Sequence, residues 1–521
     1  MVDDILAGIF GEAVFGRLGR SRRAQLLARR CFGLLALAAA GGCARPQLEP
    51  EIARHAHPRR AIPPNVVLIV LDTARADRVL ADASRFTSPY LDRLARDAVV
   101  YAGAHAVAPW TLPSHMSMFT GLLPGQHGAS WGAFAEPADM DLGEILAQRF
   151  SLADPSILLA ERLRTLGYST VAFSSNAWVS RRCGFAAGFD HFYEMWRERD
   201  RLERRYAALP RAFRSSQAID LGDAGLVLLR FREHAELEHG LREPFFLFVN
   251  LIDPHYPYSP PRPWRYAHTN DTRFAEAMAR VEWDEMQMVA GWRPFDLARL
   301  APLYDAEIGY VDWAAGRLLA WLADRGYYDE SLIAVTSDHG EHLGERGLFS
   351  HQLSVAEELL RVPLAIKYPG NGGAGTVVAD PLVSNLDLYR TLLAAAGAGG
   401  GGPATLSLDL AAGGAGARSH LVAEYDYSTP YLRQYRKRFA AFPVAEHQVV
   451  RRVVYDRAGR HEFHERGGAV ALVSAPGAAA AAAEGVLRAY LATLGERRRE
   501  RRDEALDRET LERLRALGYI D

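Results

Sequence analysis

The chain has 521 residues, of which 49% are hydrophobic and 24% charged, and this composition excludes a disordered or collagen-like protein. Its 61 basic residues nearly balance its 63 acidic residues, for a net charge of −2, so no nucleic-acid partner is indicated. Three cysteines are too few for a disulfide framework or a zinc ribbon.

The amino terminus predicts an exported protein. Residues 17–30 carry six arginines and no acidic residue, and they lead into the apolar stretch 31–40 and then Gly41-Gly42-Cys43. This order is typical of a secretory signal over 1–43, and the apolar stretch is shorter than the roughly 20 residues that span a membrane. The cysteine after two small residues resembles a bacterial lipoprotein box. We therefore expect a periplasmic or cell-envelope protein, and whether Cys43 is lipidated, which would be its only contact with the membrane, stays open.

Three apolar runs predict buried parallel strands, at residues 66–71, 245–252 and 332–336. A helical pattern between them, at 304–323, places apolar side chains on one face. This alternation predicts an α/β fold with a mostly parallel central sheet and helices on both of its faces.

Composition also suggests the limits of the parts. A spacer is expected at 44–62, before the strand and helix pattern begins. Near the carboxyl end, residues 447–465 alternate as antiparallel strands do, and 485–517 read as a charged amphipathic helix or helix pair. The predicted parts are a signal at 1–43, the spacer at 44–62, a catalytic domain at 63–395, a Gly/Ala-rich linker at 396–417, and a small antiparallel subdomain with a helix at 418–521.

Four polar residues stand where an α/β sheet places its active site, beyond the carboxyl ends of strands. Asp72 ends the first strand, and Asp338 and His339 follow another. Thr111 precedes a proline that is typical of the first turn of a helix, and a helix amino terminus suits an anionic group. Together these side chains could hold one divalent cation, which would lower the pKa of the hydroxyl and neutralise an anion.

Seven motifs give these residues a context. They are PNVVLIVLDTARAD (64–77), SPYLDRLARDAVVY (88–101), PWTLPSHMSMFTGLLPGQHG (109–128), FLFVNLIDPHYPYSPP (246–261), YDAEIGYVD (304–312), SDHGEHLGERGLFSHQ (337–352) and EELLRVPLAIKYPG (357–370). In this order they resemble the sulfatase family of the alkaline phosphatase superfamily, over residues 63–395. The resemblance implies a central mixed sheet of the alkaline phosphatase type and an enzyme that hydrolyses sulfate or phosphate esters.

The resemblance also implies roles. Asp72, Asp338 and His339 match the metal ligands of the family, and Thr111 stands where its members have their nucleophile and would also contact the metal. His255, in the segment DPHYPY, matches a histidine near the leaving group and is a candidate general acid.

His351 stands where many family members have a lysine that binds the oxygens of the anion. This chain has only two lysines, Lys367 and Lys437, so a protonated His351 would supply the missing positive charge. For His255 and His351 alike, the alternative is a loop histidine whose ring is satisfied by backbone groups.

The chain departs from the family at the nucleophile. Sulfatases carry Cys-x-Pro-x-Arg, whose cysteine is oxidised to formylglycine, whereas this chain has Thr111, Pro113 and His115. Threonine cannot become formylglycine, and His115 replaces an arginine as a substrate-binding residue. Thr73 replaces a second acidic residue. A Gly-Lys-Trp-His segment is missing, and Asn176 in the segment SSNAW is the polar residue that stands in for it toward the substrate.

These departures bear on the metal and on the reaction. A hydroxyl and an imidazole beside two carboxylates favour one Mn²⁺ or Zn²⁺ ion, with Ca²⁺ or Mg²⁺ as the alternatives. A formylglycine hydrate expels sulfate by collapsing to the aldehyde. Thr111 has no second hydroxyl, so water would have to attack its covalent ester, and this favours phosphate over sulfate.

The main hypothesis is a metal-dependent hydrolase of sulfate or phosphate esters with a Thr nucleophile. Its substrate would be a small-molecule, glycan or lipid ester, and the oligomeric state stays open. One alternative is a transferase that passes a phospho-headgroup to an acceptor at the membrane. The other is a catalytically silent envelope protein that keeps the fold after losing the cysteine, the arginine and the Lys-His segment.

Overall fold

We describe the fold from a computed structural model. The residues that it describes are 63–80, 87–130, 152, 154–207, 222–279, 294–398, 406–414, 416–439, 442–474 and 476–494. The predicted signal at 1–43 and spacer at 44–62 lie outside the described residues, as do residues 399–405 and 415 of the predicted linker and residues 495–517 of the predicted carboxyl-terminal helix.

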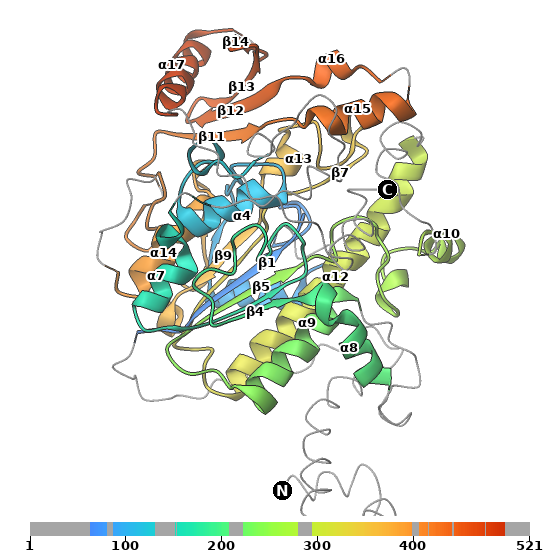
Figure 1. Ribbon diagram of the computed structural model, residues 1–521, viewed down its shortest axis with the longest axis vertical. Coiled ribbons are helices and arrows are strands. Elements are labelled where there is room, and N and C mark those ends of the chain that lie inside the picture. The colour runs from blue at the N-terminus through green and yellow to red at the C-terminus, as the bar shows by residue number, and fades with distance from the viewer. Residues whose placement is uncertain are drawn as a thin grey trace, which may run out of the picture.

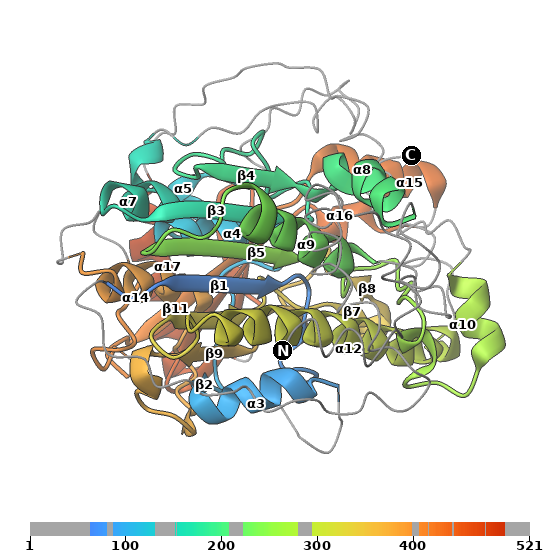
Figure 2. The same cartoon turned by 90° about the horizontal axis from the view of Figure 1, so that it is seen from below.

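An eight-stranded sheet forms the centre of the molecule (Figure 2), and its strand order is β10-β2-β9-β6-β1-β5-β3-β4. All neighbouring strands are parallel except where β9 pairs with β6 and β2, so the predicted mixed, mostly parallel sheet is confirmed. The strands are β1 (Val66–Leu71), β2 (Val99–Tyr101), β3 (Ser169–Ser174), β4 (His191–Glu194), β5 (Phe245–Leu251), β6 (Leu332–Thr336), β9 (Leu364–Lys367) and β10 (Thr376–Val378).

The central strand β1 shows why an uninterrupted apolar run becomes a strand here. All six of its residues are buried, because helices cover both faces of the sheet. Val66, Leu68 and Val70 join one hydrophobic core, and the residues between them join the other. Successive side chains of a strand point to opposite faces, so one run of apolar residues supplies both cores.

The helices divide between these two cores. Helices α4, α7 and α14 contribute to the first core, whereas α3, α9 and α12 contribute to the second, so α4 and α12 lie on opposite sides of the sheet (Figure 1). The helices are α3 (Pro89–Asp97), α4 (Thr111–Thr120), α5 (Pro124–His127), α7 (Leu159–Thr165), α8 (Met195–Ala207), α9 (Asp223–Arg232), α10 (Thr272–Met278), α12 (Pro294–Asp324), α13 (Glu357–Leu360), α14 (Leu388–Ala395), α15 (Thr429–Arg438), α16 (Val444–His447) and α17 (Ala478–Ala492).

Short helical turns join these elements. They are η4 (Pro155–Ile157), the π-helix η5 (Glu233–Glu238), η6 (Trp264–Tyr266), η7 (Glu345–Gly347), η8 (Pro369–Asn371) and η9 (Asn385–Asp387). A two-stranded ribbon of β7 (His342–Leu343) and β8 (Phe349–Ser350) follows β6.

A second, antiparallel sheet lies near the carboxyl end, as predicted. Its strands are β11 (His420–Tyr425), β12 (Val450–Asp456), β13 (Gly459–Arg466) and β14 (Ala469–Leu472), in sequence order. It lies on the side of the main sheet that carries α4 (Figure 1), and its buried residues belong to the same core as that helix. In the described part of the chain, no helix is both long enough and apolar enough to cross a membrane.

Candidate active site

The site lies where neighbouring parallel strands end. Val70 of β1 is in register with Asn250 of β5 and Thr336 of β6, so the residues that follow these strands meet at one edge. Asp72 follows β1, and Asp338 follows β6 after one intervening residue. Each of Asp72, Asp338 and His339 offers one ligand atom, and these atoms all lie within 4.8 Å of one another in a fully buried place.

The turn that follows Asp72 is strained and makes a hydrogen bond to Asp338. Thr73 has a φ of +57°, which is uncommon for a β-branched residue. This conformation accompanies a hydrogen bond of 3.1 Å from the Thr73 backbone N–H to Oδ1 of Asp338. The residue that replaces the family's second carboxylate therefore orients the remaining carboxylate through its backbone.

Thr111 is the first residue of α4, as predicted, with Pro113 in the first turn. Its side chain is fully buried. Its Oγ1 lies 3.3 Å from Nδ2 of Asn176, which donates a hydrogen bond to it, and 3.5 Å from Nε2 of His339. The hydroxyl thus lies beside the acidic pair at the amino terminus of a helix, where unpaired N–H groups favour negative charge.

The protonation of His339 tests whether a cation fits. Its Nδ1 lies 2.9 Å from the carbonyl oxygen of Gly340 and must donate there, so Nε2 carries the lone pair. This nitrogen lies 3.4 Å from Oδ2 of Asp338, and both side chains are fully buried. Two electron-rich atoms that face each other away from water are unfavourable unless a cation lies between them. Burial also lowers the pKa of His339, which keeps the ring in its neutral, ligating form. The residues present therefore fit a divalent metal ion.

Two amides hold Asp72. Nδ2 of Asn176 donates to Oδ2 of Asp72 at 2.9 Å, and Nδ2 of Asn250 donates to the same oxygen at 3.2 Å. Asn250 also holds the backbone of Asn176, whose N–H donates to Oδ1 of Asn250 at 3.2 Å. Asn176 was predicted to face the substrate, and the structure places it between Asp72 and Thr111. Asn250 was not predicted, although a polar residue inside the apolar run of β5 was a readable signal.

His115 lies one turn along α4 from Thr111 and is fully buried. Its Nδ1 lies 3.0 Å from the carbonyl oxygen of Thr111 and 3.3 Å from Oδ2 of Asp338, and its Nε2 lies 3.4 Å from Nδ2 of Asn250. Burial alone would raise the pKa of Asp338, but the hydrogen bonds from His115 and from the Thr73 backbone N–H help to lower that pKa to about 2. His115 thus supports a carboxylate of the site, and its predicted contact with substrate stays a prediction.

The two predicted loop histidines meet beside the metal ligands. Nε2 of His255 lies 3.1 Å from Nε2 of His351, and the rings of His351 and His339 lie 4.6 Å apart. Burial, His339 and His255 lower the pKa of His351 well below its usual value. The expectation that His351 carries a positive charge is therefore not supported, because its surroundings favour the neutral ring.

The model of the sulfatase family matches residues 64–398. The chain belongs to the sulfatase family. It is 25% identical over 368 residues to a sulfatase of Formosa agariphila, covering 64% of this chain and 69% of that protein. An arylsulfatase of Clostridium perfringens is 24% identical over 373 residues, covering 63% and 74%. The phosphonate monoester hydrolase SpPMH from Silicibacter pomeroyi has the same fold, with a TM-score of 0.58 and 20% identity over 85% of this chain and 100% of that one. The protein is thus a sulfatase-like ester hydrolase.

Within this sulfatase-like site, sequence reasoning also missed the residues that fix the turn before the metal ligands. Oγ of Ser114 donates to the carbonyl oxygen of Asp338 at 2.6 Å. Nδ2 of Asn385, from η9, lies within 3.3 Å of that carbonyl, of the carbonyl of Ser337 and of Oγ of Ser114. The place of Ser114 in the nucleophile motif was a readable signal. Asn385 follows all seven motifs in the sequence, so no motif pointed to it.

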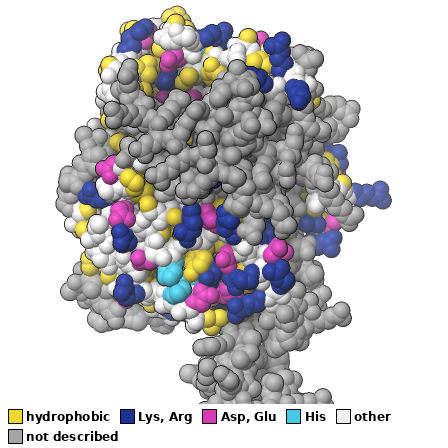
Figure 3. Space-filling model, in the orientation of Figure 1, with side chains coloured by type: hydrophobic (Ala, Val, Ile, Leu, Met, Phe, Trp, Pro, Cys, Tyr) yellow, Lys and Arg dark blue, Asp and Glu magenta, His cyan; other side chains and the backbone are white. Residues whose placement is uncertain are grey.

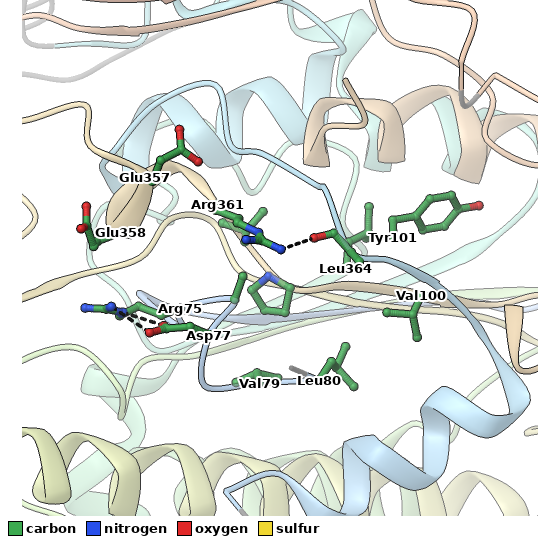
Figure 4. Close-up of a pocket in the computed structure, with 14 residues that line it drawn as sticks. Arg75, Asp77, Val79, Leu80, Val100, Tyr101, Glu357, Glu358, Arg361 and Leu364 are labelled. Carbon is green, nitrogen blue, oxygen red and sulfur yellow. Dashed lines mark hydrogen bonds and ion pairs between the residues drawn. The ribbon is translucent and has the colours of Figure 1, made fainter. Parts of the chain in front are cut away.

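A cavity of about 450 Å³ lies next to the turn after β1 and is lined by residues of that turn, β2, β9 and α13 (Figure 4). None of the predicted site residues lines it. Its charged groups are already engaged: Arg75 pairs with Asp77, Arg361 donates to the carbonyl of Ala102, and Glu358 pairs with Arg346. Every charged group that lines the cavity thus has a hydrogen-bond or ion-pair partner within the protein.

Proposed function

We propose that this protein is a metal-dependent hydrolase of sulfate or phosphate esters in which Thr111 is the nucleophile. The observation that carries the proposal is the place of Thr111 Oγ1, which faces Asn176 and His339 at the start of α4, beside the acidic pair. A hydroxyl in that place combines a polarising neighbourhood with N–H groups for an anion.

The metal would be held by Asp72, Asp338 and His339, with Oγ1 of Thr111 next to them. A bound divalent ion would supply Lewis-acid charge that lowers the pKa of the hydroxyl and neutralises the oxygens of the ester. Because the donors combine carboxylate oxygens with an imidazole nitrogen, we propose Zn²⁺ or Mn²⁺ rather than Ca²⁺, which prefers oxygen ligands alone.

In the first step, Oγ1 of Thr111 forms a bond to sulfur or phosphorus as the bond to the leaving oxygen breaks. A proton held between His255 and His351 goes to that oxygen and releases the alcohol. Water then attacks the Thr111 ester, the bond to Oγ1 breaks, and sulfate or phosphate leaves while the hydroxyl is restored. Over the cycle, the proton that leaves Thr111 replaces the one that the histidine pair donates.

The charge of the site bears on the substrate. Among the described residues, the hydrogen bonds and ion pairs of Thr111, Asp338 and His339 involve no lysine or arginine. A divalent ion would balance only the two carboxylates, so the two negative charges of a phosphate monoester would find no cationic side chain among the described partners of Thr111, Asp338 and His339. We therefore propose a singly charged ester as substrate. Since Thr111 disfavours sulfate, a phosphodiester or a phosphonate monoester is the first choice.

The test is turnover on matched aryl esters, namely a sulfate, a phosphate monoester, a phosphodiester and a phosphonate monoester, with Zn²⁺ or Mn²⁺ present. Thr111→Ala should lower kcat/KM at least about a thousandfold. Thr120→Ala is the matched control, because that hydroxyl lies at the other end of α4 and its hydrogen bonds to described residues stay within the helix and its end. Activity that Thr111→Ala retains would exclude Thr111 as the nucleophile. A preference for sulfate would show that the argument from the missing formylglycine is wrong, and metal binding without any turnover would favour the silent protein.

We also propose that the protein is exported by the signal at 1–43 and that Cys43 becomes the lipidated first residue. The support is the order of the basic, apolar and small residues. Mass spectrometry of the mature amino terminus from a bacterial host tests this. A lipid on Cys43 is expected, and an intact or unmodified amino terminus would contradict the proposal.

A further inference from the structure

Three histidines meet at a place that the proposed reaction does not use. His191 is the first residue of the edge strand β4, His234 lies in the π-helix η5, and His239 follows that helix. One nitrogen of each ring lies within 4.8 Å of those of the other two. His234 is buried, His191 is half-buried and His239 is exposed. Figure 3 shows histidine side chains, in cyan, gathered at one place on the molecular surface.

This trio is separate from the active site. The ring of His234 packs against Phe173, which belongs to the core on the α9 and α12 side of the sheet. Thr111 lies in α4, on the opposite side. In addition, His191 begins its strand, whereas Asp72 and Asp338 follow the ends of theirs.

The π-helix brings two of the three rings together. His234 and His239 are five residues apart, and the backbone N–H of His239 donates to the carbonyl oxygen of His234 at 2.9 Å. That i to i+5 bond is typical of a π-helix, and it places His239 about one wide turn beyond His234, on the same face. In an α-helix, residues five apart would point about a third of a turn away from each other. Gly240, with a φ of +76°, then ends the helix. Wide turns of this kind are frequent at functional sites.

The surroundings of the rings suit coordination. Tyr193 Oη lies 3.0 Å from Nδ1 of His234, and it is the only hydrogen bond that the described residues make to any of the three rings. A tyrosine oxygen that accepts from Nδ1–H would leave Nε2 with its lone pair, as the outer partners of metal-bound histidines do. Burial, together with the neighbouring histidines, lowers the pKa of His234 to about 3, and burial and His239 also lower the pKa of His191. These two rings are therefore neutral near pH 7, which ligation requires.

We propose that His191, His234 and His239 form a second metal site, which binds Zn²⁺ with water as the fourth ligand. Three imidazoles and one open position are a known coordination set of zinc, and imidazole is a preferred ligand of that ion. Zinc at about 2.0–2.1 Å from each nitrogen needs them closer together than 4.8 Å, and the exposed side chain of His239 can rotate to close that distance. The ion would join the edge strand β4 to the segment of α9 and η5, so it would stabilise the fold and not enter the reaction.

The experiment compares zinc binding by the full chain and by the double variant His191→Ala/His239→Ala. Both proteins are stripped with a chelator and titrated with Zn²⁺ by calorimetry, and their melting temperatures are measured with and without zinc. The double variant should bind one zinc ion fewer per chain and should lose part of the zinc-dependent rise in melting temperature. The matched control is His420→Ala/His447→Ala, which removes two half-buried histidines of the carboxyl-terminal part that belong to neither cluster. It should behave as the unaltered chain does.

Equal zinc stoichiometry and equal thermal shifts in the unaltered chain and the double variant would overturn the proposal. If the double variant fails to fold, His239→Gln replaces it, since an exposed side chain contributes little to the core. A tenfold or larger loss of affinity for one zinc ion in His239→Gln is then expected, and unchanged affinity would refute the site. The outcome does not depend on turnover, so it is independent of the proposed nucleophile.

Discussion

The two amides that donate to Asp72 give a prediction about how the active site is held. Asn176→Ala removes one bond to Oδ2 of Asp72 and the bond to Thr111. Asn250→Ala removes the other bond to Oδ2, the contact with His115 and the bond from the Asn176 backbone N–H. A hydrogen bond to a charged group is worth about 1.5–3 kcal/mol, and each 1.36 kcal/mol is a factor of ten in rate. Each variant should therefore lower kcat/KM by about ten- to a hundredfold, and Asn176→Ala should have the larger effect because it alone also releases the nucleophile.

The double variant shows whether the amides act through one atom. Because both donate to the same oxygen, each single variant leaves Asp72 one amide donor, and only Asn176→Ala/Asn250→Ala removes both. The loss in the double variant should exceed the product of the single losses by a coupling of at least about 0.5 kcal/mol. Affinity for the metal should show the same excess.

The assay for this cycle is kcat/KM on the best ester, together with metal affinity measured by calorimetry. Asn65→Ala is the control, since Asn65 is a buried amide with two hydrogen bonds just before β1, far from Asp72 along the strand. It should leave both quantities near their original values. Multiplicative effects of Asn176→Ala and Asn250→Ala, or an unchanged kcat/KM in either, would refute the reasoning.

Three further predictions concern buried groups away from the reaction. Lys367 donates from Nζ to three backbone carbonyls of residues 328–331, so Lys367→Met should lower the free energy of unfolding in urea by about 2–4 kcal/mol. Lys367→Arg should also destabilise the fold, because a planar guanidinium does not match three converging acceptors. An unaltered urea midpoint in these variants would contradict the prediction. Burial raises the pKa of Asp312 to about 8, against the backbone N–H groups of α3 that bond to it. The folded protein then keeps a proton that the unfolded chain loses near its usual 3.8, so the free energy of unfolding should fall as pH rises from about 4 to about 8; urea titrations of Asp312→Asn should show a weaker pH dependence, and the same dependence would refute the assignment. Cys183 is buried and burial raises the pKa of its thiol, so it should react with a thiol reagent only after denaturation; rapid reaction of the native protein would contradict its burial.

The elements that the sequence predicted well are those whose burial is the same on both faces. The run at 66–71 is β1, 332–336 is β6, and 245–252 exceeds β5 by one residue. The helix predicted at 304–323 lies inside α12, which begins at Pro294 and contains Pro302, a residue that usually interrupts a helix. The strands β2 and β10 were not predicted, because three residues make no readable pattern, and β10 is largely exposed.

The site could be predicted in part because parallel strands bring their ends together. Asp72, Asp338, His339 and Thr111 were found by their places after strands and before a helix, and the structure brings all four together. The positive charge expected on His351 was not supported, since a sequence position does not reveal that two other imidazoles lie against the ring. How deeply a group is buried, and what faces it, depends on contacts between distant segments.

The histidine trio shows a second limit, which arises from local geometry. Counted at the α-helical period of 3.6 residues, His234 and His239 would point in different directions, so no pattern search at that period would pair them. One extra residue in the turn brings the rings of His234 and His239 to the same face. The helix holds this residue because α9 continues directly into η5 without a side-chain cap between them. The third ring comes from the edge strand β4, which lies far from the other two in the sequence. It reaches the pair because Tyr193 of β4 contacts Arg230 of α9 and His234 of η5. Three histidines with no common spacing in the sequence therefore become one cluster through a single widened helical turn.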